Sequence, residues 1–214
     1  MRDFPIFTTD FGVSSLILRE IPYRQEAYIH IQDVQPEGFY EHLKECAAFC
    51  RACGAEKVYA TGHEVLEQYP LHTVIWRMRG SRENLPQTDA ALWPVLPENV
   101  ESWRMIYNKS MVSVANASYM SEADAKTMLE AGDGSFIHRG DTLLGIGKAS
   151  GGMIEAVASV CPGSGVDIVA ALAGVLTEDA VTLEVASTNE KAIRLYERLG
   201  FIRTGERSRW YRIK

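Results

Sequence analysis

The sequence predicts an α/β fold built on a mixed (α+β) sheet, and three observations support this class. Segments with strand-like and helix-like hydrophobic spacing alternate along the chain, and glycine-containing turns separate them. From residue 91 the expected order is β-α-α-β-β-β-α-β-α-β-β, which places an antiparallel meander inside the sheet. The first part of the chain, up to about residue 80, contains a weaker copy of the second half of this order.

Each element follows from a local pattern. Ala91–Leu96 is expected as a strand, and Pro97-Glu98-Asn99 opens a helix. Ser121 begins a second helix that Gly132 ends, and Gly140-Asp141 closes a hairpin. The remaining expected elements are strands at 135–139, 142–149 and 153–161, an apolar helix at 166–176, a strand at 181–186, a helix at 189–199, and two short strands at 201–204 and 209–213.

The polar, proline-interrupted segment 85–89 is the expected boundary between two parts, residues 1–85 and residues 86–214. Aligning Val34 with Val160 superimposes several elements of the first part on counterparts in the second. These are strands at 15–19, 27–34 and 57–61 and a helix at 39–53. We therefore interpret residues 1–85 as a degenerate half-copy produced by internal duplication.

Composition excludes several classes of protein. The net charge of −6 argues against nucleic-acid binding, which needs a basic face. No apolar run is long enough for a membrane span of ~18 residues, and residues 1–12 contain none typical of a signal peptide. Four cysteines in this arrangement do not form a disulfide framework. We expect a cytoplasmic monomer or homodimer without a membrane partner.

The stretch from Val181 to Phe201 is the most informative part of the chain. It reads as a strand, a capping box formed by Ser187 and Glu190, an amphipathic helix and a stop at Gly200. One helix face is expected to pack inward, and it consists of Ala192, Leu195, Tyr196 and Leu199.

These residues resemble the C-terminal signature of the GNAT superfamily of N-acetyltransferases. The matching positions are Asn189, Ala192, Leu195-Tyr196-Glu197 and Gly200-Phe201. With the order of elements upstream, the resemblance covers about residues 90–214. It implies a GNAT-like acyl-CoA N-acyltransferase fold with an N-terminal partial repeat. It also implies direct transfer of an acetyl group from acetyl-CoA, the cosubstrate, to a primary amine of a small molecule or peptide.

The resemblance also implies roles for two residues of this signature. Tyr196 corresponds to the tyrosine that acts as general acid near the coenzyme sulfur, and a phenol with a pKa of about 10 keeps its proton at neutral pH. The alternative is that Tyr196 only packs. Asn189 corresponds to a residue that hydrogen-bonds the pantetheine or phosphate region, and the alternative is a purely capping role.

By the same resemblance, the loop before helix 166–176 holds the coenzyme pyrophosphate with backbone N–H groups. The implied coenzyme-binding residues are Val160, Gly163, Ser164, Gly165, Val166 and Asp167. Pro162 and Asp167 depart from the family pattern, and the loop contains no Lys or Arg. The alternative function is therefore a non-catalytic GNAT-fold regulatory or interaction module with weakened or lost coenzyme binding.

Two general bases are considered. Glu155 lies on the strand before the loop, where some family members carry a catalytic glutamate, and His138 lies on a neighbouring strand. Strand alternation places Glu155, Val157 and Ser159 on one face. The alternative for Glu155 is a solvated carboxylate at the strand edge.

The cysteine cluster Cys46, Cys50 and Cys53, preceded by His42, has a spacing found in some metal sites. One helix face cannot surround a metal ion tetrahedrally, so we interpret these residues as packed core and expect no metal. The half-copy lacks a glycine loop at Pro36-Glu37-Gly38-Phe39 and is predicted to bind no coenzyme. The whole interpretation requires the strands that precede Cys161 and Asn189 to diverge and leave room for a pantetheine arm.

Overall fold

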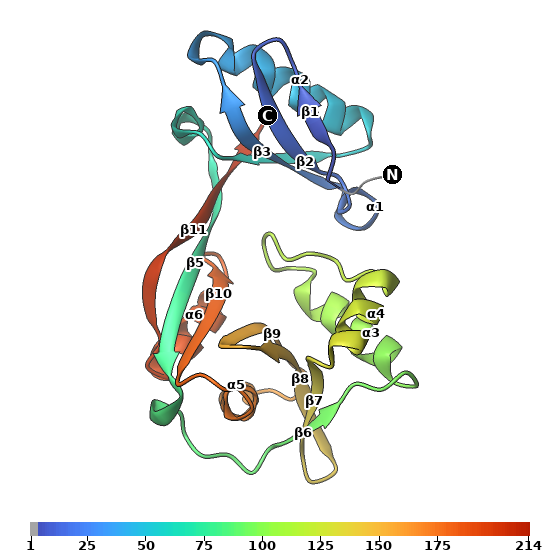
Figure 1. The fold of residues 1–214 in the computed structure, drawn as a ribbon, viewed down its shortest axis with the longest axis vertical. Coiled ribbons are helices and arrows are strands. Elements are labelled where there is room, and N and C mark those ends of the chain that lie inside the picture. Colours follow the sequence, from blue (N-terminus) through green and yellow to red (C-terminus); the bar gives the residue numbers. More distant parts are fainter. Residues whose placement is uncertain (1–3) are drawn as a thin grey trace. The chain divides into compact units, whose positions relative to one another are not determined.

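The computed structural model describes residues 4–214; residues 1–3, at the start of the N-terminal stretch considered above, lie outside the described residues. The chain forms two compact units, whose elements are labelled in Figure 1. Unit 1 comprises the chain up to Val74 together with Ser208–Lys214, and unit 2 comprises Ile75–Arg207. The division thus falls before the segment 85–89 that sequence analysis took as the boundary, and the last strand returns to unit 1.

Unit 1 is a sheet covered by one long helix. Its elements are β1 (Ile6–Thr8), β2 (Gly12–Ile17), α1 (Ile21–Arg24), β3 (Glu26–Val34), α2 (Phe39–Ala52) and β4 (Lys57–Thr61). The strand order is β1-β2-β3-β4-β11, in which only β3 and β4 run parallel. The apolar face of α2 packs on this sheet through Phe39, Leu43, Cys46 and Cys50.

Unit 2 contains the remaining elements, although β5 begins in unit 1 and β11 ends there. They are β5 (Leu71–Ser81), β6 (Ala91–Pro94), α3 (Val100–Met111), α4 (Glu122–Ala131), β7 (Gly134–Arg139), β8 (Thr142–Ser150), β9 (Met153–Ser159), α5 (Gly165–Gly174), β10 (Ala180–Ala186), α6 (Glu190–Arg198) and β11 (Ile202–Ile213). The strand order is β5-β10-β9-β8-β7-β6, in which only β9 and β10 run parallel. The mixed α/β class is confirmed.

The two units share one topology. The series β1-β2-β3-β4-β11 and β7-β8-β9-β10-β5 have the same sequence of antiparallel and parallel pairings, and a helix (α2 or α5) links the parallel strands in each. This correspondence supports the proposed duplication.

Each unit completes its sheet with a strand that comes from the other half of the chain. Strand β5 leaves unit 1 and pairs antiparallel with β10 over residues 75–81 of unit 2. Strand β11 leaves unit 2 and pairs antiparallel with β4 through Tyr211–Ile213 of unit 1. Neither half of the sequence therefore contains all the strands of one unit.

Three expectations about local structure were wrong. The segments 201–204 and 209–213 form one continuous strand, β11, because no residue between them breaks the extended chain and both ends find partners. The expected capping box of Ser187 and Glu190 is replaced by a cap at Asn189, whose Oδ1 accepts the Ala192 N–H. Of the three helical cysteines, Cys53 is exposed, since it lies where α2 ends.

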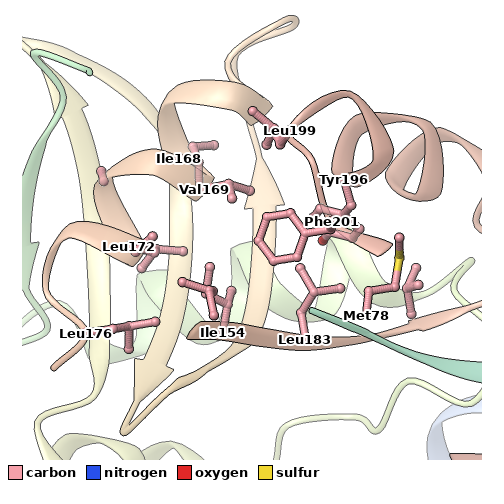
Figure 2. Close-up of a cluster of buried hydrophobic side chains, with 14 of the residues drawn as sticks. Met78, Ile154, Ile168, Val169, Leu172, Leu176, Leu183, Tyr196, Leu199 and Phe201 are labelled. Atoms are coloured by element: carbon pink, nitrogen blue, oxygen red, sulfur yellow. The ribbon is translucent and has the colours of Figure 1, made fainter. Parts of the chain in front are cut away.

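The main core of unit 2 lies between α5, α6 and the sheet (Figure 2). Its fully buried side chains include Met78 from β5, Ile168 from α5 and Leu183 from β10. A second cluster, centred on the buried Trp103 of α3, lies on β7, β8 and β9. Strand β9 is therefore covered by different helices on its two faces.

Candidate active site

The pairing between parallel strands β9 and β10 ends early. Only Met153 with Thr182 and Ile154 with Leu183 are in register. Strand β10 continues to Ala186 and β9 to Ser159, so the strands separate beyond Ile154. This is the divergence that the sequence interpretation required.

A β-bulge at Glu155 marks the point of separation. Lys148 of β8 faces Ala156, whereas the next residue, Ala149, faces Ile154, so Glu155 is an extra residue in β9. A bulge interrupts the ladder and increases the local twist of the strand. The bulge therefore accounts for the separation of β9 from β10.

The bulge also changes which side chains share a face. Ile154 and Val157 both pack in the core beneath α5 and α6, while Ala158 packs in the cluster around Trp103. Simple alternation, which put Ile154 opposite Val157, was therefore wrong, because it assumed an uninterrupted strand. Glu155 does not share a face with Val157 either, since its carboxylate contacts Lys148 and Ser150, which flank Ala149 on β8.

The loop between β9 and α5 is open at its glycine. Gly163 has a φ of +86°, which favours glycine, and a Cβ built there meets no atom within 4 Å. The Ser164 hydroxyl is used internally, since it lies 3.0 Å from the Leu144 carbonyl and 2.7 Å from the Cys161 carbonyl. The N–H of Val160 is bonded to Leu144 as well, at 2.9 Å. The Ser164 N–H also donates, to the Cys161 carbonyl at 3.3 Å, so the backbone groups left for a ligand are mainly those of Gly163 and of the first helical turn from Gly165.

The first turn of α5 packs closely on α6. A Cβ on Gly165 would lie 2.8 Å from Leu195 Cδ2, so only glycine fits there without displacement. Val166 packs against the main core of unit 2. The N–H groups of this first turn have no partner within the helix, as at every helix start, and are available to an anion.

Asp167 is engaged rather than free. Its Oδ1 accepts hydrogen bonds from Thr88 Oγ1 at 2.9 Å and from Arg139 Nη2 at 2.6 Å. Asn189 caps α6 through Oδ1, and its side-chain nitrogen Nδ2 has no hydrogen-bond partner among residues 4–214. Asn189 therefore performs the capping role while keeping a donor for a ligand.

Tyr196 is a buried member of the main core (Figure 2). Its ring lies 5.9 Å from that of Phe201, and the same cluster contains Ile154 and Leu183, the last paired residues of β9 and β10. The inward-facing stripe predicted for α6 is confirmed. Burial raises the pKa of Tyr196 to about 12, so its hydroxyl stays protonated at neutral pH.

Glu155 is held in a polar cluster on the other face of β9. Lys148 Nζ lies 2.6 Å from Glu155 Oε2 and 3.3 Å from Asp133 Oδ2, and the Ser150 hydroxyl donates to Glu155 Oε1 at 2.7 Å. Partial burial by itself would raise the pKa of Glu155, but these hydrogen bonds and the lysine charge outweigh it and lower the pKa. The carboxylate is therefore ionised and a weak base in this arrangement.

His138 lies away from the diverging strands. It is on β7, which β8 separates from β9, and its ring is 5.6 Å from that of Trp93 on β6. The structure thus brings Tyr196, Asn189 and the Gly163 loop to the ends of β9 and β10, and leaves His138 outside this group.

The corresponding strands of unit 1 are closed. Five consecutive pairs, from Glu26 with Lys57 to His30 with Thr61, join β3 and β4 over the whole length of β4. The turn that corresponds to the Gly163 loop is covered, because a Cβ on Gly38 would lie only 2.2 Å from the Phe11 ring. These contacts support the prediction that the half-copy binds no coenzyme.

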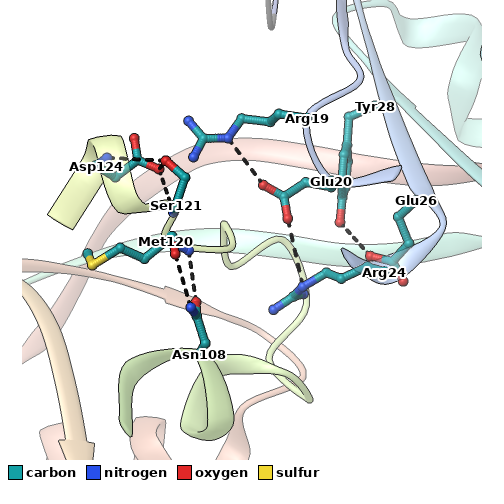
Figure 3. Close-up of polar contacts among 9 residues, drawn as sticks. All are labelled: Arg19, Glu20, Arg24, Glu26, Tyr28, Asn108, Met120, Ser121 and Asp124. Carbon is teal, nitrogen blue, oxygen red and sulfur yellow. Dashed lines mark hydrogen bonds and ion pairs between the residues drawn. The ribbon is translucent and has the colours of Figure 1, made fainter. Parts of the chain in front are cut away.

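Unit 2 has a hollow beside α3, of about 380 Å³, lined by Arg104, Met105, Ile106, Asn108, Lys109 and Tyr119. The connection from α3 to α4 forms one wall. Asn108 fixes it by bonding both backbone groups of Met120, at 2.8 and 3.0 Å, and the Ser121–Asp124 capping box starts α4 (Figure 3). The hollow is therefore bounded by a connection that side-chain hydrogen bonds hold in place.

Two negative findings concern residues 4–214. Within this range no group of three or more His, Cys, Asp or Glu side chains is arranged to hold a metal ion. The helices described there are all too short or too polar to cross a membrane.

The chain matches no protein-family model and no curated protein sequence. It is similar to solved structures at low sequence identity. A conserved protein of unknown function from Staphylococcus epidermidis has a TM-score of 0.60 at 14% identity, covering 99% of this chain and 94% of that chain. A GCN5-related N-acetyltransferase from Kribbella flavida has a TM-score of 0.60 at 14% identity, with 99% and 89% covered.

A tandem GNAT protein from the clavulanic acid biosynthesis pathway has a TM-score of 0.53 at 13% identity, with 99% of this chain and 83% of that chain covered. Structural similarity at such low sequence identity shows the fold alone. This protein has the fold of the GCN5-related (GNAT) N-acetyltransferases.

Proposed function

We propose that this chain transfers an acetyl group from acetyl-CoA to a primary amine of a small molecule or peptide. The observation that carries the proposal is the end of β9–β10 pairing at the Glu155 bulge. Backbone groups beyond this point lack their ladder partners, and the extended, amide-containing pantetheine arm can replace those partners. In unit 1 the equivalent pair stays in register over the whole length of β4, so the early separation is specific to unit 2.

The coenzyme is expected to run from the start of α5 to the core near Tyr196. Its pyrophosphate would accept hydrogen bonds from backbone N–H groups of Gly163, Gly165 and Val166 at the positive end of the helix. The Ser164 N–H donates to the Cys161 carbonyl at 3.3 Å, so Ser164 would contribute only if that bond opens. The Asn189 amide would donate to the pantetheine arm. These contacts follow the residues that the GNAT signature assigns to the coenzyme.

The chemistry proposed is direct transfer. The neutral amine attacks the thioester carbonyl, the new C–N bond forms as the C–S bond breaks, and the ammonium proton leaves while the thiolate gains one. Tyr196 donates its hydroxyl hydrogen to the sulfur as negative charge develops there. Because its pKa of about 12 exceeds that of an ordinary thiol, about 8.5, hydrogen-bond donation contributes more than complete proton transfer.

Glu155 remains the proposed base. With its carboxylate paired to Lys148, it can accept the amine proton only if binding of the acceptor loosens that ion pair. The net charge of −6 favours a small-molecule or peptide acceptor over a nucleic acid. A cytoplasmic location and a monomeric or homodimeric state stay predictions.

Calorimetric titration with acetyl-CoA, followed by a mass-spectrometric screen of amines, tests the proposal. We expect micromolar binding and an acetylated product. Tyr196→Phe keeps the buried ring and should reduce kcat by about tenfold or more with little change in coenzyme affinity. The matched control is Tyr40→Phe, an exposed tyrosine in unit 1, which should be fully active. Full activity of Tyr196→Phe would remove this hydroxyl from the mechanism.

A second candidate function is a non-catalytic GNAT-fold regulatory or interaction module. It is favoured by the internal use of the Ser164 hydroxyl and the Val160 N–H, and by Pro162 in place of a polar residue. Absence of binding at millimolar acetyl-CoA would support this module and reject the transferase.

A further inference from the structure

The start of α5 carries a charge arrangement that extends beyond the loop itself. Asp167, in the first turn, is bonded to Arg139 of β7, and Arg139 Nε also donates to Asp89 Oδ1 at 2.7 Å. Thr88 adds a second contact to Asp167. Thr88 and Asp89 belong to the connection between β5 and β6, so this connection and β7 are both tied to the start of the helix.

These ion pairs are too exposed to contribute much to folding. The side chains of Arg139, Asp167 and Asp89 are 46%, 23% and 74% exposed. Ion pairs at such exposure are screened by water and salt and add little stability. Their charges are therefore more important for what approaches the same helix end than for the fold.

An anion at the start of α5 would meet the Asp167 carboxylate. Residues 160–168 contain no Lys or Arg that could offset this charge. Without Arg139, the carboxylate would be unpaired beside the N–H groups that are proposed to hold a phosphate, and would repel it. The guanidinium, at 2.6 Å, offsets this charge, although it is shared with Asp89, and holds the side chain toward β7.

We propose that Arg139 is a positioning residue for coenzyme binding, which makes the start of α5 accessible to a pyrophosphate by neutralising and orienting Asp167. The inference rests on the proposed function, because it takes the coenzyme as the ligand of this loop. It explains how a loop that lacks its own basic residue and carries an aspartate can still receive a doubly charged group.

The test is calorimetric titration of coenzyme A into the full chain and three variants. Arg139→Gln should weaken binding by about tenfold at low salt, the effect of one unit charge at ~10 Å in a medium of intermediate dielectric constant. Adding Asp167→Asn should restore the affinity to within about twofold of wild type. The loss of coenzyme A affinity caused by Arg139→Gln should become smaller in high salt. Pantetheine, which has no phosphate, should bind wild type and variants equally.

Equal affinity of Arg139→Gln and wild type for coenzyme A, or no recovery in the double variant, would overturn the inference while leaving the proposed function standing. Failure of wild type to bind coenzyme A and pantetheine would reject the proposed function and this inference together. Asp167→Asn alone keeps the test informative if Arg139→Gln does not fold, since it should bind coenzyme A at least as tightly as wild type. Weaker binding by this variant would contradict the role given to Arg139.

Discussion

Deleting residues 1–85 should prevent unit 2 from folding, although residues 86–214 were the domain that the sequence suggested. The deletion removes β5, which pairs with β10 through seven residues, from Ser81 with Ala180 to Ile75 with Ala186. It also removes Met78, which is fully buried in the main core of unit 2. Strand β10, the strand that borders the candidate active site, would become an exposed edge.

The loss of folding free energy can be estimated from these contacts. About seven inter-strand hydrogen bonds at a net contribution near 1 kcal/mol each give roughly 7 kcal/mol. Removing the buried Met78 side chain adds about 2–5 kcal/mol. The total, roughly 9–12 kcal/mol, matches the whole stability of a typical domain, about 5–15 kcal/mol. We therefore expect residues 86–214 alone to be unfolded.

The assay compares two fragments, 86–214 and 71–214, which differ only by β5 and the connection that follows it. Circular dichroism and urea unfolding should show a cooperative transition for 71–214 and none for 86–214. The comparison controls for the loss of unit 1, since both fragments lack β1–β4. A cooperative transition of similar midpoint in both fragments would refute the claim that β5 is an integral strand of unit 2.

Three further predictions concern single residues. Burial lowers the pKa of His42, whose ring nitrogens lie 2.8 and 2.7 Å from the Thr9 and Ser14 hydroxyls; Glu45 opposes this shift only partly. As the pH falls through 6.5, the ordinary pKa of histidine, His42 therefore takes up a proton more readily in the unfolded chain than in the native one. Urea unfolding should show the free energy of unfolding falling from pH 7.5 to 5.5. A His42→Leu variant, destabilised by about 1–3 kcal/mol at pH 7.5, should lack this part of the pH dependence. Burial raises the pKa values of Cys46 and Cys50 to about 11 and 12, so a thiol reagent should modify only Cys53 and Cys161 in the native protein, and rapid reaction of all four would contradict their burial. If Glu155 is the base, Glu155→Gln should lower kcat by about 100-fold or more with unchanged coenzyme affinity, whereas an unaltered kcat would leave it a structural partner of Lys148.

Elements set by neighbouring residues could be read from the sequence. The Gly140-Asp141 hairpin, the helix begun by Ser121 and ended by Gly132, and the inward face of α6 all formed as expected. In these cases the turn conformation, the caps and the apolar spacing are decided within a few residues of the chain. The GNAT-type signature around Tyr196 belongs to the same class, since it occupies one strand–helix unit.

Contacts between distant residues were decided only in the tertiary structure. The pairing of β5 with β10 and of β11 with β4 exchanges strands between the halves of the sequence, and no local pattern specifies a strand's partner. The bulge at Glu155 depends on the register of β9 against β8, so alternation alone gave the wrong faces. The ion pair that holds Asp167 joins residues far apart in sequence. The sequence by itself determined most of the helices and strands after residue 91 and the position of the GNAT-type signature, but it gave no indication of β5. The tertiary structure decided which strands pair, where they separate and which charges meet, because those outcomes depend on long-range packing.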